Sequence, residues 1–110
     1  MTNIFGTIFP FIENNDTSAR LGRHVANRSF LEALLKYSDF NEYHIFCLST
    51  AHFENTRKQI LSFKLPEAAK GKVKLYLYSA LIEMLKSTDY SIFHLGGWGY
   101  FFSGLVYLRN

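Results

Sequence analysis

Residues 90–100, with the sequence YSIFHLGGWGY, join a short apolar run to three glycines, and a further apolar segment follows them. The apolar run predicts a buried strand. Glycine lets the backbone turn sharply and approach a ligand closely. The segment after the glycines predicts a helix that packs back on the sheet. We therefore expect a strand, a turn and a helix here, with the turn lining a ligand cleft.

The rest of the chain repeats this strand-then-helix pattern. Strands are predicted at residues 3–9, 43–48, 73–78 and 91–95, and helices at 19–37, 51–63 and 79–88 and in a segment that extends toward residue 108. Apolar strands that alternate with helices are typical of a parallel sheet joined by right-handed crossovers. The predicted fold class is α/β: an open, doubly wound parallel sheet of about four strands with helices on both faces.

Turn and capping residues set the predicted boundaries. Pro10 cannot donate to a neighbouring strand and ends the first strand. Ser49 with Thr50, and later Ser79, are expected to cap the helices that follow them. Residues 66–71 are expected to form a polar connection. The buried stripe of the first long helix is expected to consist of Ala26, Phe30, Ala33, Leu34 and Tyr37.

The composition indicates one small domain over residues 1–110. The chain is 48% hydrophobic, which is more apolar than a disordered chain. No apolar run reaches the roughly 18 residues of a membrane-spanning helix. The start lacks the basic region of a secretion signal, so we expect a cytoplasmic protein, with a peripheral place at the inner face of the membrane left open. Cys47, the one cysteine, lies in an apolar run and is expected to be a small buried side chain.

The charge distribution argues against a nucleic-acid partner. The formal net charge is +3, and the basic residues are scattered along the chain. A nucleic-acid surface is expected to gather basic residues into one patch, with aromatic side chains among them. We therefore expect no nucleic-acid partner.

Ligands of open parallel sheets bind beyond the carboxyl ends of the strands, where the strand order reverses. The strand order 3-2-1-4 puts this point between the first and fourth strands, where loops 10–18 and 96–99 would meet. The candidate substrate-binding residues in and beside these loops are Asp16, Ser18, Arg20, His94, Gly96, Gly97 and Trp98. No residue is assigned a catalytic or metal-binding role.

Each candidate also has a purely structural interpretation. The glycines could direct backbone N–H groups at an anion, or form a tight turn without a ligand. Trp98 could stack on a sugar or a base, or pack on neighbouring helices. His94 could act on a substrate oxygen or be satisfied locally. Asp16 could bind ligand hydroxyls or cap a helix, and Arg20 could hold a phosphate or face solvent.

The standard nucleotide-binding patterns are absent from the sequence. Counting from Gly97, Gly99 fits the second glycine of the dinucleotide fingerprint, but Phe102 stands where the third is required. The loop at residues 10–16 has no glycine, and no P-loop occurs. No cofactor is therefore expected. The histidines show no metal-ligand spacing, and His44, inside the second strand, is expected to be structural.

These features resemble the N-terminal domain of a retaining glycosyltransferase of the two-domain GT-B type, family 4. The resemblance covers essentially the whole chain. It rests on the first strand (residues 4–10), on the run Ser18-Ala19-Arg20-Leu21-Gly22-Arg23, and on the fourth strand (residues 90–94) with the Gly96-Gly97-Trp98 turn. The family usually has a glycine pair in the loop after the first strand, where this chain has Ser18-Ala19 and only Gly22.

The resemblance implies a Rossmann-like domain that binds the sugar acceptor, while a second domain binds the nucleotide-sugar donor. The chain would then be the N-terminal fragment of a glycosyltransferase and inactive alone. The alternative is a stand-alone Rossmann-like or flavodoxin-like binding module without catalysis. A sheet of four strands should also expose an apolar edge or face, so we expect a homo-oligomer, which sedimentation at high concentration checks.

Overall fold

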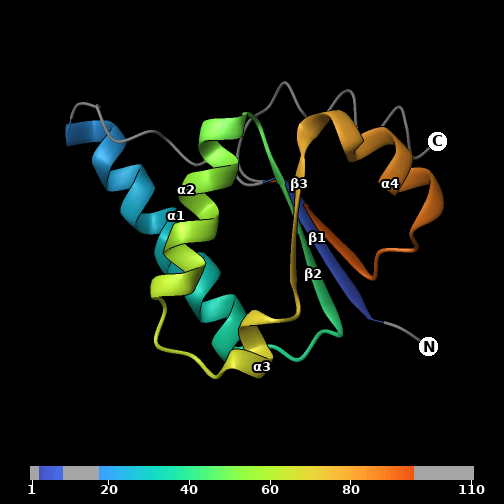
Figure 1. The fold of residues 1–110 in the computed structure, drawn as a ribbon, viewed down its shortest axis with the longest axis horizontal. Coiled ribbons are helices and arrows are strands. Elements are labelled where there is room, and N and C mark those ends of the chain that lie inside the picture. The colour runs from blue at the N-terminus through green and yellow to red at the C-terminus, as the bar shows by residue number, and fades with distance from the viewer. Residues whose placement is uncertain (1–2, 9–17, 96–110) are drawn as a thin grey trace.

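The computed structural model describes residues 3–8 and 18–95, and of residues 18–27 and 95 it describes the backbone alone. Within the described residues, strands and helices alternate as predicted apart from one additional short helix at 67–70 (Figure 1), and the predicted helix toward residue 108 lies outside the described residues. The elements are β1 (Ile4–Ile8), α1 (Ser18–Tyr37), β2 (Glu42–Cys47), α2 (Thr50–Ser62), α3 (Glu67–Lys70), β3 (Val73–Leu77), the 3-10 helix η1 (Tyr78–Ala80), α4 (Leu81–Ser87) and β4 (Ile92–Leu95).

The four strands form one parallel sheet in the order β3-β2-β1-β4. Figure 1 shows α1 and α2 on one side of the sheet and α4 on the other. The α/β fold class, the strand order and the helices on both faces are confirmed, and the arrangement is Rossmann-like. Strands β2 and β3 follow β1 toward one edge of the sheet. After β3 the chain crosses through α4 to the other side of β1, where β4 lies. The strand order therefore reverses between β1 and β4.

The face of the sheet beneath α1 and α2 holds the larger of two apolar clusters. Alternate strand residues point into it because successive side chains of a strand face opposite sides. Its buried members are Phe5, Leu31, Leu35, Tyr43, Ile45, Cys47, Ile60 and Phe63. Burial raises the pKa of the Cys47 thiol to about 11, so this side chain stays protonated and is a small buried hydrophobe, as expected.

The buried stripe of α1 differs from the expected one. Leu31 and Leu35 are 0% and 4% exposed and contact the sheet, whereas Phe30 and Tyr37 are 38% and 78% exposed. Ala33 is exposed as well. Leu31 and Leu35 are one turn apart and share one side of the helix, and Leu34 of the expected stripe is partly buried against the same cluster, so the helix is rotated toward the two leucines.

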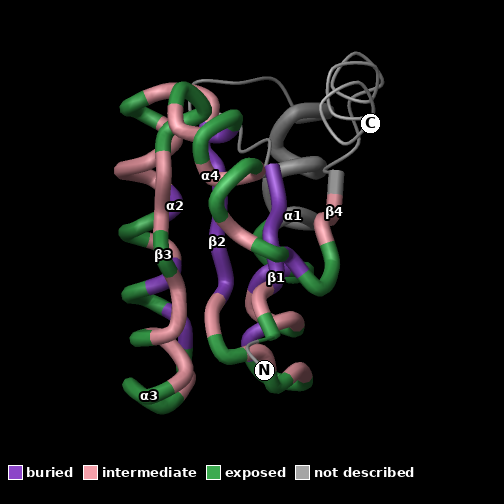
Figure 2. Tube along the Cα trace, turned by 90° about the vertical axis from the view of Figure 1, so that its right-hand side faces the viewer, coloured by how far each residue is buried: buried purple, intermediate pink, exposed green. Residues whose placement is uncertain are grey.

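The opposite face carries the second apolar cluster, between the sheet and α4. Ile8, Phe46, Leu81 and Tyr90 are buried there, and Figure 2 shows β1 and β2 as the most buried strands. Gly6 lies on this face, directly under aromatic rings. A Cβ atom at Gly6 would lie 2.7 Å from the Phe93 ring and 2.8 Å from the Tyr90 ring. The absence of a side chain at Gly6 therefore lets these rings pack on the backbone of β1.

Of the two predicted helix caps, one is confirmed and the other is wrong. Ser49 caps α2, since its Oγ accepts a hydrogen bond from the backbone N–H of His52 at 3.2 Å. The cap at Ser79 is wrong, because the chain leaving β3 tightens into η1 and α4 begins without a side-chain cap. The expected connection at residues 66–71 contains the short helix α3. Within the described ranges, no helix has the length and apolar character needed to cross a bilayer.

Candidate functional site

The predicted site at the carboxyl edge is described only in part. Gly96, Gly97 and Trp98 lie outside the described residues, as does Asp16, and the loops 10–18 and 96–99 lie outside them almost entirely. Ser18 and Arg20 are in the first turn of α1, at its N-terminal end, with side chains that are not described. What the structure does define at this edge is His94 and its surroundings.

His94 lies next to β1, where the strand order reverses. Thr7 of β1 and His94 of β4 are paired in the sheet. The Thr7 Oγ1 and His94 Nδ1 atoms are 3.0 Å apart, within hydrogen-bond distance. The imidazole stacks on the ring of Phe30 in α1, with centroids 4.9 Å apart, and lies 6.3 Å from the ring of Phe5. His94 is thus held by one hydrogen bond and by aromatic contacts on the α1 side of the sheet.

The surroundings of His94 favour a neutral imidazole with its proton on Nε2. Burial lowers the pKa of His94 below its ordinary value, because the charged ring would lose hydration. Thr7 is fully buried, and its hydroxyl lies 3.4 Å from the Ile8 carbonyl oxygen but 3.0 Å from His94 Nδ1. The shorter contact is the better hydrogen bond. With Thr7 donating to Nδ1, the ring proton is on Nε2, which can donate to a ligand oxygen.

Thr7→Val tests this tautomer. Valine keeps the shape of the side chain but removes the donor, so the neutral ring should divide between both tautomers instead of favouring Nε2–H. Heteronuclear NMR of the imidazole nitrogens in the labelled chain measures the ratio. Thr56→Val is the matched control, since Thr56 is equally buried but contacts Cys47. An unchanged tautomer ratio in Thr7→Val would show that another group fixes the ring.

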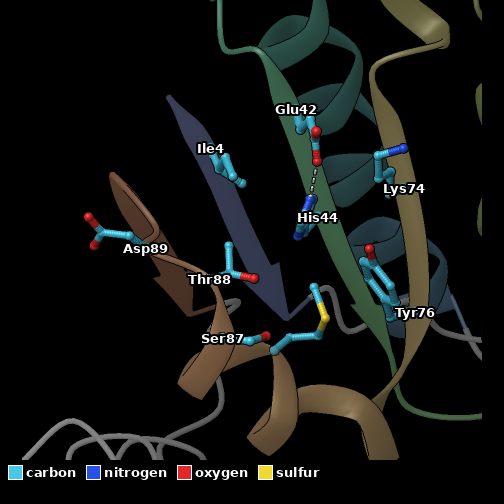
Figure 3. A pocket seen from close by; sticks show the side chains of 9 residues that line it. Ile4, Glu42, His44, Lys74, Tyr76, Ser87, Thr88 and Asp89 are labelled. Carbon is cyan, nitrogen blue, oxygen red and sulfur yellow. Dashed lines mark hydrogen bonds and ion pairs between the residues drawn. The ribbon is translucent and has the colours of Figure 1, made fainter. Parts of the chain in front are cut away.

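A second polar cluster lies at the amino ends of the strands, on the α4 face. His44 is only 3% exposed, and both ring nitrogens have partners. Nε2 is 2.7 Å from Glu42 Oε1, and Nδ1 is 2.9 Å from the Tyr90 hydroxyl oxygen. Figure 3 shows Glu42 and His44 joined along β2. Because a carboxylate only accepts, Nε2 carries a proton, and in the neutral ring Tyr90 then donates to Nδ1.

The cluster forms a directed chain of hydrogen bonds that ends on Glu42. Burial raises the pKa of Tyr90 to about 12, although a hydrogen bond with the Thr88 side chain lowers it. The phenol therefore keeps its proton and remains a donor to His44. Each donor in this chain points toward the Glu42 carboxylate. The buried His44 hydrogen-bonds Glu42, and both of its ring nitrogens have partners, which is consistent with the structural part expected for it.

A pocket of about 570 Å³ opens beside this cluster. It lies between β3, the first half of β1 and β2, and the C-terminal end of α4, and Figure 3 shows its side chains. Its walls include Ile4, Glu42, His44, Lys74, Tyr76, Met84 and Thr88. Sequence reasoning missed this pocket. The spacing of Glu42 and His44, two residues apart on one strand, indicates a shared face, but their meeting with Tyr90 depends on the tertiary fold.

The described residues include no group of three histidine, cysteine or acidic side chains arranged to hold a metal ion. The fold and this geometry define the chain as an α/β protein with a doubly wound parallel sheet. Comparisons with protein-family models, with curated proteins and with solved structures found no match.

Proposed function

We propose that the chain is the N-terminal, acceptor-side domain of a glycosyltransferase that transfers a sugar from a nucleotide-sugar donor to an acceptor. In this proposal Asp16, Ser18, Arg20, His94, Gly96, Gly97 and Trp98 surround the acceptor. A second domain supplies the donor site, and the chain alone is inactive. A cytoplasmic location, at most peripheral to the membrane, and self-association belong to the same proposal. Ile92, 51% exposed on the edge strand β4, is consistent with self-association.

One observation carries this proposal. The reversal of strand order lies between β1 and β4, and the paired residues Thr7 and His94 stand side by side there. Open parallel sheets bind ligands beyond the carboxyl ends of strands at such a point. A neutral histidine with its proton on Nε2 is suited to hold a hydroxyl or carbonyl oxygen of a substrate. A sugar acceptor is rich in such oxygens.

A turnover assay with nucleotide sugars tests the division into two domains. We expect no transfer by the 110-residue chain, and transfer by the product of the complete reading frame, which should encode a second Rossmann-like domain with paired glutamates. The physical reason is that the donor-binding groups lie outside this chain in the proposal. Measurable transfer by the 110-residue chain would contradict it, and a reading frame without a second domain would favour the binding module.

Trp98→Ala in that longer enzyme tests the acceptor side. An aromatic contact of about 1–1.5 kcal/mol with a sugar ring corresponds to about a tenfold increase in the acceptor KM, with the donor KM unchanged. Tyr37→Ala is the control, because Tyr37 is 78% exposed on α1. An acceptor KM that does not respond to Trp98→Ala would assign this tryptophan a structural role.

The alternative, a binding module without catalysis, is favoured by one separate observation. The pocket beside Glu42 is formed entirely by residues of this chain and lies at the opposite end of the strands from His94. A small ligand there would need no second domain. The turnover assay separates the two functions, because a binding module would transfer no sugar, either as the 110-residue chain or as the product of the complete reading frame.

A further inference from the structure

We propose that the pocket at the amino ends of β1, β2 and β3 is a binding site for a small neutral carbohydrate or a similar polyol. This site is distinct from the predicted acceptor site, because it opens on the α4 face, whereas His94 contacts α1 at the carboxyl edge. The inference does not depend on glycosyl transfer. The volume of the pocket, about 570 Å³, falls within the range of roughly 300–1,000 Å³ that is usual for small-molecule pockets.

The polar side of the pocket contains a hydrogen-bond acceptor on β2 and a donor on the neighbouring strand β3. Lys74 pairs with His44 across β2 and β3, and Glu42 lies on the same face two residues before His44. Glu42 Oε1 accepts a hydrogen bond from His44 Nε2. The Glu42 side chain is 35% exposed, so the carboxylate also faces the pocket. No ion pair of the described residues engages Lys74. The same pocket is therefore lined by a carboxylate and by an ammonium group.

This pair selects hydroxyl groups. A hydroxyl donates to a carboxylate and accepts from an ammonium group at the same time. An anion would be repelled by Glu42 and by Asp89 at the rim, and a cation would compete with Lys74 for Glu42. A purely apolar ligand would bury the carboxylate without a partner, which is unfavourable. Figure 3 shows Thr88 on the side of the pocket away from Lys74.

The remaining walls suit the carbon skeleton of a sugar. Ile4 and Met84 are partly buried apolar side chains that contribute to the pocket. The ring of Tyr76 is held by stacking on Phe46, with centroids 5.4 Å apart, and by contact with His44 at 5.2 Å. Fixed aromatic and apolar surfaces lose little entropy when they contact the C–H groups of a sugar ring. Hydroxyl recognition by Glu42 and Lys74 would then supply the specificity.

An NMR titration of the labelled 110-residue chain tests the site. The probes are D-glucose, D-galactose, D-mannose and myo-inositol, with acetate and tetramethylammonium as charged comparisons. We expect at least one neutral probe to shift the backbone amide signals of Glu42, Lys74 and Tyr76 in a saturable way, while those of Phe30 and His94 stay unchanged. The proposal is overturned if no neutral probe saturates these signals, or if acetate or tetramethylammonium binds more tightly.

Two matched pairs of variants complete the test. Glu42→Gln should lower the affinity for the probe about tenfold or more, because hydrogen bonds to a charged acceptor are about twice as strong as neutral ones. Glu54→Gln, the same change on the exposed face of α2, should have no effect. Lys74→Met should also weaken binding, against Lys58→Met as its control. Lys74 is exposed, so Lys74→Met should fold even if Glu42→Gln does not. In that case, unchanged affinity of Lys74→Met for the probe would overturn the proposal.

Discussion

Gly6→Ala should lower the free energy of unfolding by about 1–3 kcal/mol, the usual cost of overpacking a core. The added Cβ would lie 2.7 Å from the ring of Phe93 and 2.8 Å from that of Tyr90, closer than carbon atoms can approach. These two rings also contact one another edge to face, with centroids 5.2 Å apart, so neither can move alone. Urea denaturation of the variant and the parent chain measures the loss.

The cause can be isolated with a control and a double variant. Gly71→Ala should change stability by less than about 1 kcal/mol, because a Cβ there meets its nearest atom at 3.3 Å and the backbone φ of −66° suits alanine. In a Phe93→Leu background, Gly6→Ala should cost less, since one of the two clashing rings is gone. Equal losses in both backgrounds would place the strain elsewhere.

Tyr90→Phe should lower the free energy of unfolding by about 1–3 kcal/mol, although it removes a single oxygen atom. The ring still fills its place beneath α4, but Nδ1 of His44 loses its donor. His44 is 3% exposed, so water cannot readily replace the lost hydroxyl. The energy of leaving a buried acceptor unpaired is the physical origin of the effect. Thermal and urea denaturation give the magnitude.

The control for this prediction is Tyr37→Phe, which should leave stability unchanged because Tyr37 is 78% exposed. The pH dependence provides a second signature. Burial raises the pKa of Tyr90 from 10.0 to about 12, so the folded state disfavours its phenolate. The associated stability is present below pH 10 and is lost as the pH rises from 10 to about 12. Tyr90→Phe should lose less stability in this interval, and identical profiles for the two proteins would contradict the assignment.

The two polar sites differ in how far the sequence could predict them. His94 was predicted at the carboxyl edge because an apolar run followed by glycines marks the end of a strand, and this needs only neighbouring residues. Its partner Thr7 is 87 residues away, and no local pattern joins the two. Glu42, Lys74 and Tyr76 were not predicted, because they lie on two strands whose alignment sets which side chains are neighbours.

The sequence by itself determined the order of the four strands and of α1, α2 and α4, the α/β class and the cap at Ser49. These features depend on periodicity, β-branched and aromatic runs, and turn residues, which act over a few positions. It did not determine which stripe of α1 is buried, because the rotation toward Leu31 and Leu35 depends on the sheet that the helix meets.

Only the tertiary structure decided the environment of the two histidines. Parallel pairing puts Thr7 beside His94, and the return of α4 across the sheet brings Tyr90 to His44. Both contacts join residues more than forty positions apart. The stretch 90–100, from which the fold was first inferred, thus contributes a residue to each site. Tyr90, which precedes β4, packs on the α4 face, whereas His94 of β4 contacts α1 on the other face.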